Sequence, residues 1–136
     1  MIQWWQILLL TLYAGFQIHD ELEWYSSAGS AVFSGFITGL IMGDMATGLF
    51  IGGSMQLTIL GVGTFGGASR IDANSGTLIA TAFAVSAGMD PEQALAALGV
   101  PVAAILVYTD ILGRMANTFW GHACDADIEK MDWKAY

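Results

Sequence analysis

One polar patch in the chain combines residue types that could do chemistry. Asp72 lies two residues after Arg70, and more short polar side chains follow at once, whereas the flanking segments are apolar. Carboxylates and amides hydrogen-bond to the hydroxyl groups of neutral sugars, often beside an aromatic ring. The residues of these types in and near the patch are Gln56, Phe65, Asp72 and Asn74. We therefore predict a ligand site here; the alternative is that these side chains only cap and pack the backbone.

A second polar break holds the acidic residues Asp20, Glu21 and Glu23, directly after an apolar run. Two interpretations stay open for this break. One is a solvated turn between aromatic anchors, because Trp and Tyr favour the membrane–water interface. The other is a charged group that faces a cavity, because a charge inside a membrane is costly and usually functional.

No pattern in the chain indicates catalysis or a metal site. His19 and His122 are far apart in the sequence, and neither has the spacing of a zinc ligand pair. Cys124 is the single cysteine, so an intrachain disulfide is excluded. We expect Cys124 to be a small side chain near a helix end; a redox-active or phosphoryl-carrying thiol is the alternative. We predict no catalytic residue, no metal and no cofactor.

The run from Gly61 to Gly66 matches the dinucleotide fingerprint G-x-G-x-x-G. Residues 57–60 could form the strand that this fingerprint requires before it. The helix that should open at the third glycine is not indicated, because the next residues lack an apolar face and contain two more glycines. A soluble dinucleotide-binding fragment is therefore only a remote alternative.

The composition indicates an all-α membrane protein. Hydrophobic residues make up 55% of the 136 residues and charged residues 12%, whereas a soluble domain carries about 25% charged residues. The mean hydropathy is +0.59. The net charge is −8, with four basic residues in all, which argues against a nucleic-acid partner because that needs clustered Lys and Arg.

Apolar runs predict several transmembrane helices around a Gly-rich element. Between Gly52 and Gly76 the backbone is expected to leave the helix, as a re-entrant or broken-helix element that lines a cavity. Asp44 either ends one helix and caps the next or contacts a ligand. Asp90 followed by Pro91 predicts another helix start. The expected apolar segments are residues 4–18, 31–53, 77–89 and 93–112.

Glycines at four-residue spacing predict close helix packing. On a helix this spacing makes a stripe of small residues along which a second helix can approach. The residues expected to have packing or structural roles are Gly35, Gly39, Gly43, Asp44, Gly52 and Gly53, and the pair Gly48 and Gly52 repeats the four-residue spacing.

The sequence also predicts how the chain is divided and oriented. Residues 1–112 are expected to form the membrane domain, and residues 113–136 a polar tail. Three of the four basic residues, Arg114, Lys130 and Lys134, fall in this tail. Because positive charges favour the cytoplasmic side, we expect the tail to lie in the cytoplasm.

These motifs together resemble a known family, the IIC subunits of mannose/fructose/sorbose-type permeases of the bacterial sugar phosphotransferase system. The elements that carry the resemblance are Gly43-Asp44-Met45, Gly48, Gly52-Gly53-Ser54-Met55-Gln56-Leu57, Leu60-Gly61, Gly66-Gly67-Ala68 and Asp72-Ala73. Asp20-Glu21 resembles the acidic pair after the family's first helix, which adds both residues to the candidate substrate-binding set. Phe119, His122-Ala123 and Asp125 resemble its F-x-H-A-x-D segment.

The chain departs from the family pattern in two motifs and in length. The family usually has His-Arg-Pro or similar after the acidic pair, where this chain reads LEWYSSAGS, and its P-D-A element appears as Ile71-Asp72-Ala73. Family members are about twice this length, so the resemblance covers their N-terminal half.

The resemblance implies a multi-pass subunit in the bacterial cytoplasmic (inner) membrane that works in an oligomeric complex. It implies pairing with a IID membrane subunit, and transport of a hexose-type sugar that the cytoplasmic IIA and IIB proteins phosphorylate. The IIC chain itself carries no phosphoryl group. The alternative is a truncated or split subunit that acts as an assembly partner without complete transport activity.

Overall fold

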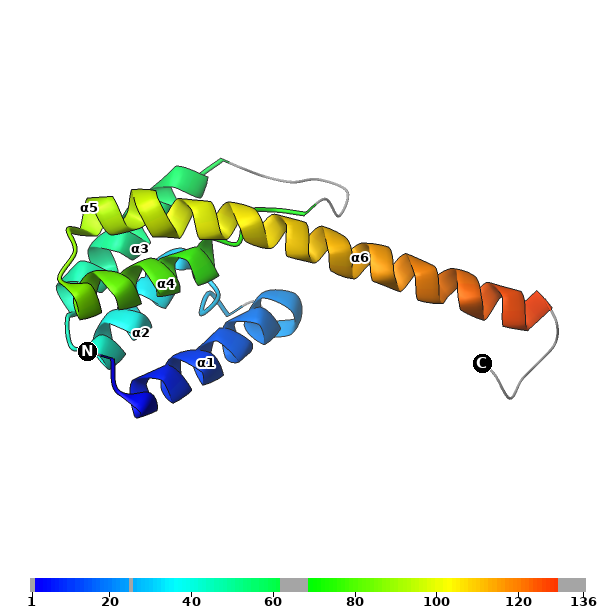
Figure 1. Cartoon of the computed structure of the whole chain (residues 1–136), viewed down its shortest axis with the longest axis horizontal. Coiled ribbons are helices and arrows are strands. Elements are labelled where there is room, and N and C mark those ends of the chain that lie inside the picture. Colours follow the sequence, from blue (N-terminus) through cyan, green and yellow to red (C-terminus); the bar gives the residue numbers. More distant parts are fainter. Residues whose placement is uncertain (1, 25, 62–68, 130–136) are drawn as a thin grey trace.

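The computed structural model describes residues 2–24, 26–61 and 69–129, and these form helices with no strand among them (Figure 1). The helices are α1 (Trp4–His19), the π-helical turn η1 (Asp20–Trp24), α2 (Ala31–Met42), α3 (Met45–Ile59), α4 (Ala73–Ala87), α5 (Pro91–Ala94), the π-helical turn η2 (Leu95–Gly99) and α6 (Val100–Glu129). This architecture confirms the predicted all-α class of membrane protein.

Short polar side chains start four of these helices. Each accepts a hydrogen bond from the backbone N–H three residues later, which satisfies a donor that has no partner inside the helix. The capping residues are Ser30, Asp44, Asp72 and Asp90. The helix break predicted at Asp44 and the helix start predicted at Asp90 are therefore confirmed.

The tightest helix contact is between α2 and α3, where glycines face each other. A Cβ added to Gly35 would lie 2.9 Å from the Cα of Gly52, and a Cβ added to Gly39 would lie 2.7 Å from the backbone oxygen of Asp44. A Cβ on Gly48 would lie 2.8 Å from the Cα of Gly39. Such distances exclude any side chain at these positions, so the small residues allow the two backbones to meet.

Gly43 and Gly53 do not lie at this contact within the described residues, and the packing role of Gly53 stays a prediction. Gly43 ends α2 at a φ of 89°, a left-handed conformation that favours glycine. No described atom lies within 4 Å of the position that a Cβ on Gly53 would take. The four-residue spacing stops predicting contacts at Gly43 because the helix itself ends there.

α4 lies inside the bundle, against α2, α3 and the helical stretch from α5 to α6. A Cβ on Gly76 would lie 2.5 Å from the backbone oxygen of Gly99 and 2.9 Å from the Cβ of Ala103. The buried residues around α4 are mostly alanines, with Ile51 and Met55 as the larger side chains. Small residues again let the helices approach closely, as in membrane bundles.

The expected loss of helix between Gly52 and Gly76 is wrong at both ends of that stretch. α3 continues to Ile59, and α4 already begins at Ala73. The break is therefore confined to residues 60–72, of which residues 62–68 lie outside the described part. Capping explains the early start of α4, because Asp72 supplies the acceptor that the first turn needs.

Within the described residues, one continuous helix is long and apolar enough to span a membrane, from Pro91 to Asp125. The apolar helices α2 and α3 are shorter. The helix does not end with the apolar segment at residue 112, because α6 runs on to Glu129. Pro101 lacks an N–H, and the helix widens just before it into η2, where the N–H of Val100 reaches back to the carbonyl of Leu95.

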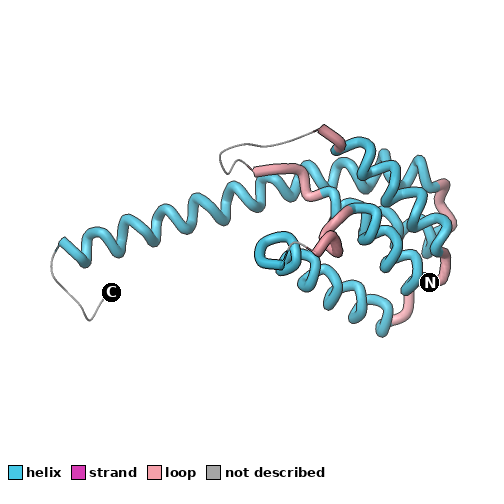
Figure 2. Tube along the Cα trace, turned by 180° about the vertical axis from the view of Figure 1, so that it is seen from behind, coloured by secondary structure: helices cyan, strands magenta, loops and turns pink. Residues whose placement is uncertain are grey.

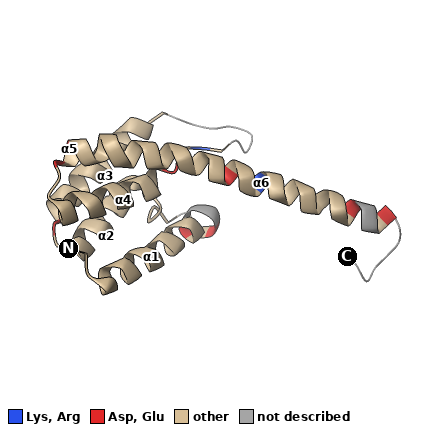
Figure 3. Cartoon of the chain, in the orientation of Figure 1, with Lys and Arg blue, Asp and Glu red and all other residues tan. Residues whose placement is uncertain are grey.

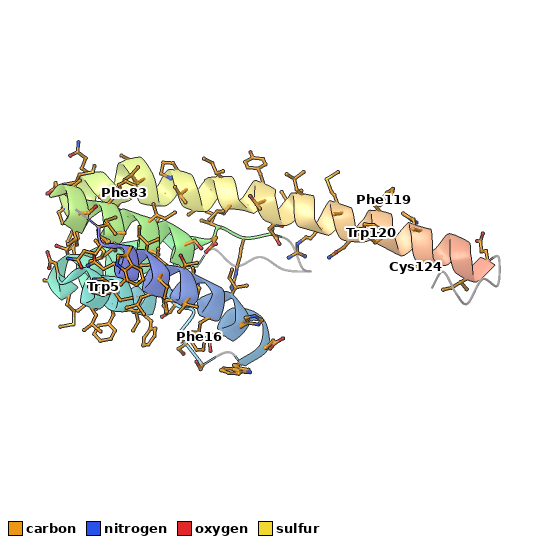
Figure 4. The ribbon with its side chains drawn as sticks, turned by 60° about the horizontal axis from the view of Figure 1, so that its bottom comes forward. Trp5, Phe16, Phe83, Phe119, Trp120 and Cys124 are labelled. Carbon is orange, nitrogen blue, oxygen red and sulfur yellow. The ribbon has the colours of Figure 1, made fainter. Side chains whose placement is uncertain are left out.

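The second half of α6 projects away from the other helices (Figure 2). From residue 108 onward every described side chain of α6 is exposed. Large apolar side chains are among them, including Phe119 and Trp120 (Figure 4). Charged residues gather at helix ends and along this half of α6, while the bundle interior is almost free of them (Figure 3).

Candidate functional site

Side chains from three parts of the chain converge on the residues that precede α2. Residues 26–30, which we call the pre-α2 loop, follow η1 directly. The Asp20 carboxylate of η1 folds back onto this loop. Its Oδ2 accepts a hydrogen bond from the backbone N–H of Gly29 at 2.9 Å, and its Oδ1 accepts one from the backbone N–H of Ser26 at 3.1 Å. The hydroxyl of Ser26 also donates to Oδ1, at 2.5 Å.

Asn74 and Gln56 reach the same loop from two other helices. The Asn74 side chain, in the first turn of α4, donates to the backbone oxygen of Gly29. The backbone oxygen of Asn74 accepts from the Ser34 hydroxyl of α2 at 2.9 Å. Near the end of α3, Gln56 Oε1 accepts from the backbone N–H of Ala31 at 3.0 Å. Three of the predicted site residues thus meet where α2 begins.

Two residues of α1 that sequence reasoning missed belong to the same network. The Tyr13 hydroxyl donates to the backbone oxygen of Ala28 at 3.0 Å. Gln17 Nε2 donates to the Ser75 hydroxyl of α4 at 3.2 Å. Helical spacing was the available signal, since Leu10, Tyr13, Gln17 and Asp20 recur every three or four residues and so share one face.

Asp72 joins this network through Ser75. Its Oδ1 accepts from the backbone N–H of Ser75 at 3.0 Å, which caps α4, while the Ser75 hydroxyl receives the hydrogen bond from Gln17. The Asp72 side chain is half-buried. It therefore lies at the same end of α4 as Asn74, and Ser75 links it to Gln17 of α1.

Two predicted site residues cannot be placed in this network. Phe65 lies outside the described residues. The backbone of Glu21 belongs to η1, but its side chain is not described. Their predicted contacts with a ligand stay predictions.

Asp20 is buried, with 1% of its surface exposed, so the solvated-turn interpretation is wrong for this residue. The Ser26 hydroxyl holds the pKa of the Asp20 carboxyl below its usual range, although burial acts in the opposite direction. The backbone N–H groups of Gly29 and Ser26 add to the lowering. The carboxylate is therefore an ionised acceptor that ties the pre-α2 loop to η1.

The network contains amides, hydroxyls and two carboxylates, and no pair that could activate a nucleophile. His19 is exposed and lies 4.0 Å from Glu23, and Cys124 is exposed on the projecting part of α6. Among the described residues no three His, Cys, Asp or Glu side chains gather closely enough to hold a metal ion. Such donors and acceptors suit a neutral ligand with many hydroxyl groups.

The strand required before a dinucleotide fingerprint is not formed. Residues 57–59 are the last turn of α3, and Leu60 ends that helix. The suggested strand at residues 57–60 is thus wrong, and Gly63 and Gly66 of the fingerprint lie outside the described residues.

Comparison with known proteins gives one family. The family model described as "PTS system sorbose-specific iic component" matches residues 4–136. The chain is 32% identical over 99 residues to the PTS system sorbose-specific EIIC component of Lacticaseibacillus casei, which is 73% of this chain and 35% of that protein. It is 34% identical over 89 residues to the PTS system mannose-specific EIIC component of Escherichia coli K12, or 65% of this chain and 33% of that protein.

A third relative is the putative N-acetylgalactosamine permease IIC component 2 of Escherichia coli K12. It is 36% identical over 72 residues, which is 53% of each chain. The matched part of this chain thus spans about a third to a half of the length of these curated relatives. No solved structure gives a significant match.

Proposed function

The chain belongs to the family of sorbose-specific IIC components of the sugar phosphotransferase system, and from this premise we propose that it is a membrane permease subunit for a hexose-type sugar. In this proposal the sugar crosses the membrane through a path that the chain helps to form. A partner IIB protein phosphorylates the sugar as it emerges. The chain itself supplies binding and positioning rather than a phosphoryl-carrying residue.

The observation that carries the proposal is the polar network at the start of α2. Asp20, Gln56 and Asn74 come from three separate helical elements and meet on one short loop. The surrounding bundle is apolar and built from small residues. Polar groups buried in an apolar bundle are costly, so their concentration in one place favours a ligand-related role.

The partners in this proposal are a IID membrane subunit and the cytoplasmic IIA and IIB proteins, within an oligomeric complex. The proposed location is the bacterial cytoplasmic membrane, with several helices in the bilayer. The spanning-length helix from Pro91 to Asp125 and the exposed apolar side chains of α6 support this location. Such a surface needs lipid or another apolar protein surface to cover it.

A second candidate function is that of an assembly partner without a complete transport path. The observation that favours it is an open apolar groove between α1 and α4. Its lining residues are Ile2, Ile7, Leu10, Thr11, Ala14 and Leu78. A groove of this kind favours contact with a further helix, as in other membrane bundles.

The matched pair Asp72→Asn and Asp90→Asn tests the site. Both aspartates cap a helix by accepting one backbone N–H, and Asn caps about as well as Asp. We expect Asp72→Asn to lose one charge-assisted hydrogen bond to the sugar, about 1.5–3 kcal/mol, or roughly a ten- to hundredfold loss of sugar affinity. Asp90→Asn should leave affinity unchanged.

The measurement is sugar binding or uptake in the reconstituted complex, with membrane expression checked for each variant. Normal expression and unchanged affinity of Asp72→Asn, together with a loss of affinity in Asp90→Asn, would show that the site is misplaced. Full assembly of the complex without any sugar uptake would favour the assembly-partner function.

A further inference from the structure

Gln17 has a buried amide with one end unpaired. Only 1% of the residue is exposed. Its Nε2 donates to the Ser75 hydroxyl at 3.2 Å, whereas its Oε1 has no hydrogen-bond partner among the described residues. Reversing the amide would pair the oxygen with Ser75 and leave the nitrogen without a partner. In either orientation one end of this amide requires a hydrogen-bonding group that the described chain does not supply.

Other buried side chains also have a polar atom without a partner, but theirs can pair with the backbone of their own helix. Among the described residues these are Thr38, Thr77 and Thr81, each within a helix. A threonine hydroxyl can rotate onto the backbone carbonyl of its own preceding turn. The Gln17 amide has no such choice, because its bond to Ser75 occupies one end in either orientation and leaves the other end without a partner among the described residues.

Gln17 lies among the residues of the candidate site. Tyr13 precedes it by one turn and Asp20 follows it by one turn, on the same face, and both bind the pre-α2 loop. Ser75, its one partner, is the residue that Asp72 caps. Gln17 is therefore flanked by site residues on α1 and joined to them on α4.

We propose that Gln17 is a sugar-contacting residue of this site, and that the unpaired end of its amide forms a hydrogen bond with a hydroxyl group of the transported sugar. This proposal rests on the proposed function. A hydroxyl group suits the position because it can donate to the amide oxygen or accept from the amide nitrogen. A resident water molecule offers the same chemistry, so the test must separate the two.

Gln6 provides a matched control on the same helix. Its Nε2 donates to the backbone oxygen of Ile41 at 3.0 Å, and its Oε1 accepts from the backbone N–H of Gln3 at 2.8 Å. Both ends of the Gln6 amide are therefore paired, and it lies at the far end of α1 from the site. Met is close to Gln in size and shape and removes both hydrogen-bonding groups.

The experiment compares Gln17→Met with Gln6→Met in the full chain, purified with the membrane subunits that it assembles with. Binding of mannose, sorbose and N-acetylgalactosamine is measured by calorimetry, and the melting temperature is measured without sugar. We expect Gln17→Met to lower the affinity about tenfold, the loss expected for one hydrogen bond. Its melting temperature without sugar should change little, because the loss of the bond to Ser75 and the removal of an unpaired buried amide end act in opposite directions.

Gln6→Met should show the opposite pattern, with a lower melting temperature and unchanged affinity. Unchanged affinity of Gln17→Met would overturn the proposal. If its melting temperature without sugar also falls as far as that of Gln6→Met, a resident water or a structural role accounts for the amide. Failure of the wild-type complex to bind any of the three sugars would instead count against the proposed function, and the Gln17 proposal would fall with it.

Discussion

Asp20 is a buried carboxylate whose ionised form is destabilised by burial and stabilised by hydrogen bonds. A carboxylate inside a protein is costly unless hydrogen bonds replace its water. Here the backbone N–H groups of Ser26 and Gly29 and the Ser26 hydroxyl do so. Because they stabilise the ionised form, the pKa of Asp20 lies below its usual range. The carboxylate thereby orders the loop on which Asn74 also converges.

We expect Asp20→Asn to lower the melting temperature of the purified chain at neutral pH, because the amide can accept fewer of these hydrogen bonds. The folded pKa of Asp20 is lower than its unfolded value of about 3.9. Its stabilisation is therefore present above that value and is lost as the pH falls through the folded pKa. The difference in melting temperature between wild type and Asp20→Asn should shrink as the pH falls below about 4.

Asp125→Asn is the control for this prediction, since Asp125 is exposed on α6. It should change the melting temperature little at any pH. A difference between wild type and Asp20→Asn that stays constant into the acid range would show that Asp20 acts through its shape rather than its charge.

At the scale of the elements, the α2–α3 contact holds two helices that both carry site residues. Gln56 lies near the end of α3, and it reaches the first residue of α2 only because the two backbones meet at Gly35 and Gly52. Close glycine contacts gain their stability from van der Waals packing over a large area. The distance between the helices therefore sets the geometry of the Gln56 hydrogen bond.

Gly39→Leu should force α2 and α3 apart, because even a Cβ there would lie 2.7 Å from the backbone oxygen of Asp44. We expect a loss of about 1–3 kcal/mol of stability, by analogy with overpacked interiors. Gly53→Leu on α3 is the control, since no described atom lies within 4 Å of its Cβ position. Thermal unfolding and the yield of assembled complex check the prediction. Equal melting temperatures and equal yields of complex for the two variants would contradict the close contact between α2 and α3.

At the scale of the whole molecule, the chain is an apolar bundle with one long projecting helix (Figure 1). The spanning-length stretch from Pro91 to Asp125 holds 35 residues, whereas about 20 residues cross the hydrocarbon core. Part of this helix therefore extends beyond the bilayer if the helix spans it. We still predict that residues 113–136 lie on the cytoplasmic side, because the basic residues concentrate there.

Cys124 offers a direct test of this orientation, because it is the single cysteine and it is exposed. A membrane-impermeant maleimide should label it in inside-out vesicles and leave it unlabelled in intact spheroplasts. Cys124→Ser should remove all labelling of the chain in both preparations. Labelling from the outside of sealed spheroplasts would reverse the proposed orientation.

The sequence by itself determined the features that depend on neighbouring residues. The helix starts at Asp44 and Asp90 could be predicted because a cap involves only the next turn. The close approach at Gly35 and Gly39 could be predicted because small residues at helical spacing make a stripe on one helix. The class of protein followed from composition, and the family from the motifs around Gln56 and Asp72.

Only the tertiary structure decided which of these residues come together. Asn74 and Gln56 lie far from Gly29 and Ala31 along the chain, and no local preference brings their side chains onto one loop. The same holds for Gln17, whose type suggested nothing until its burial and its single partner on α4 were known. Capping and spacing act within a turn or two of helix, whereas a binding site requires the packing of several helices at once.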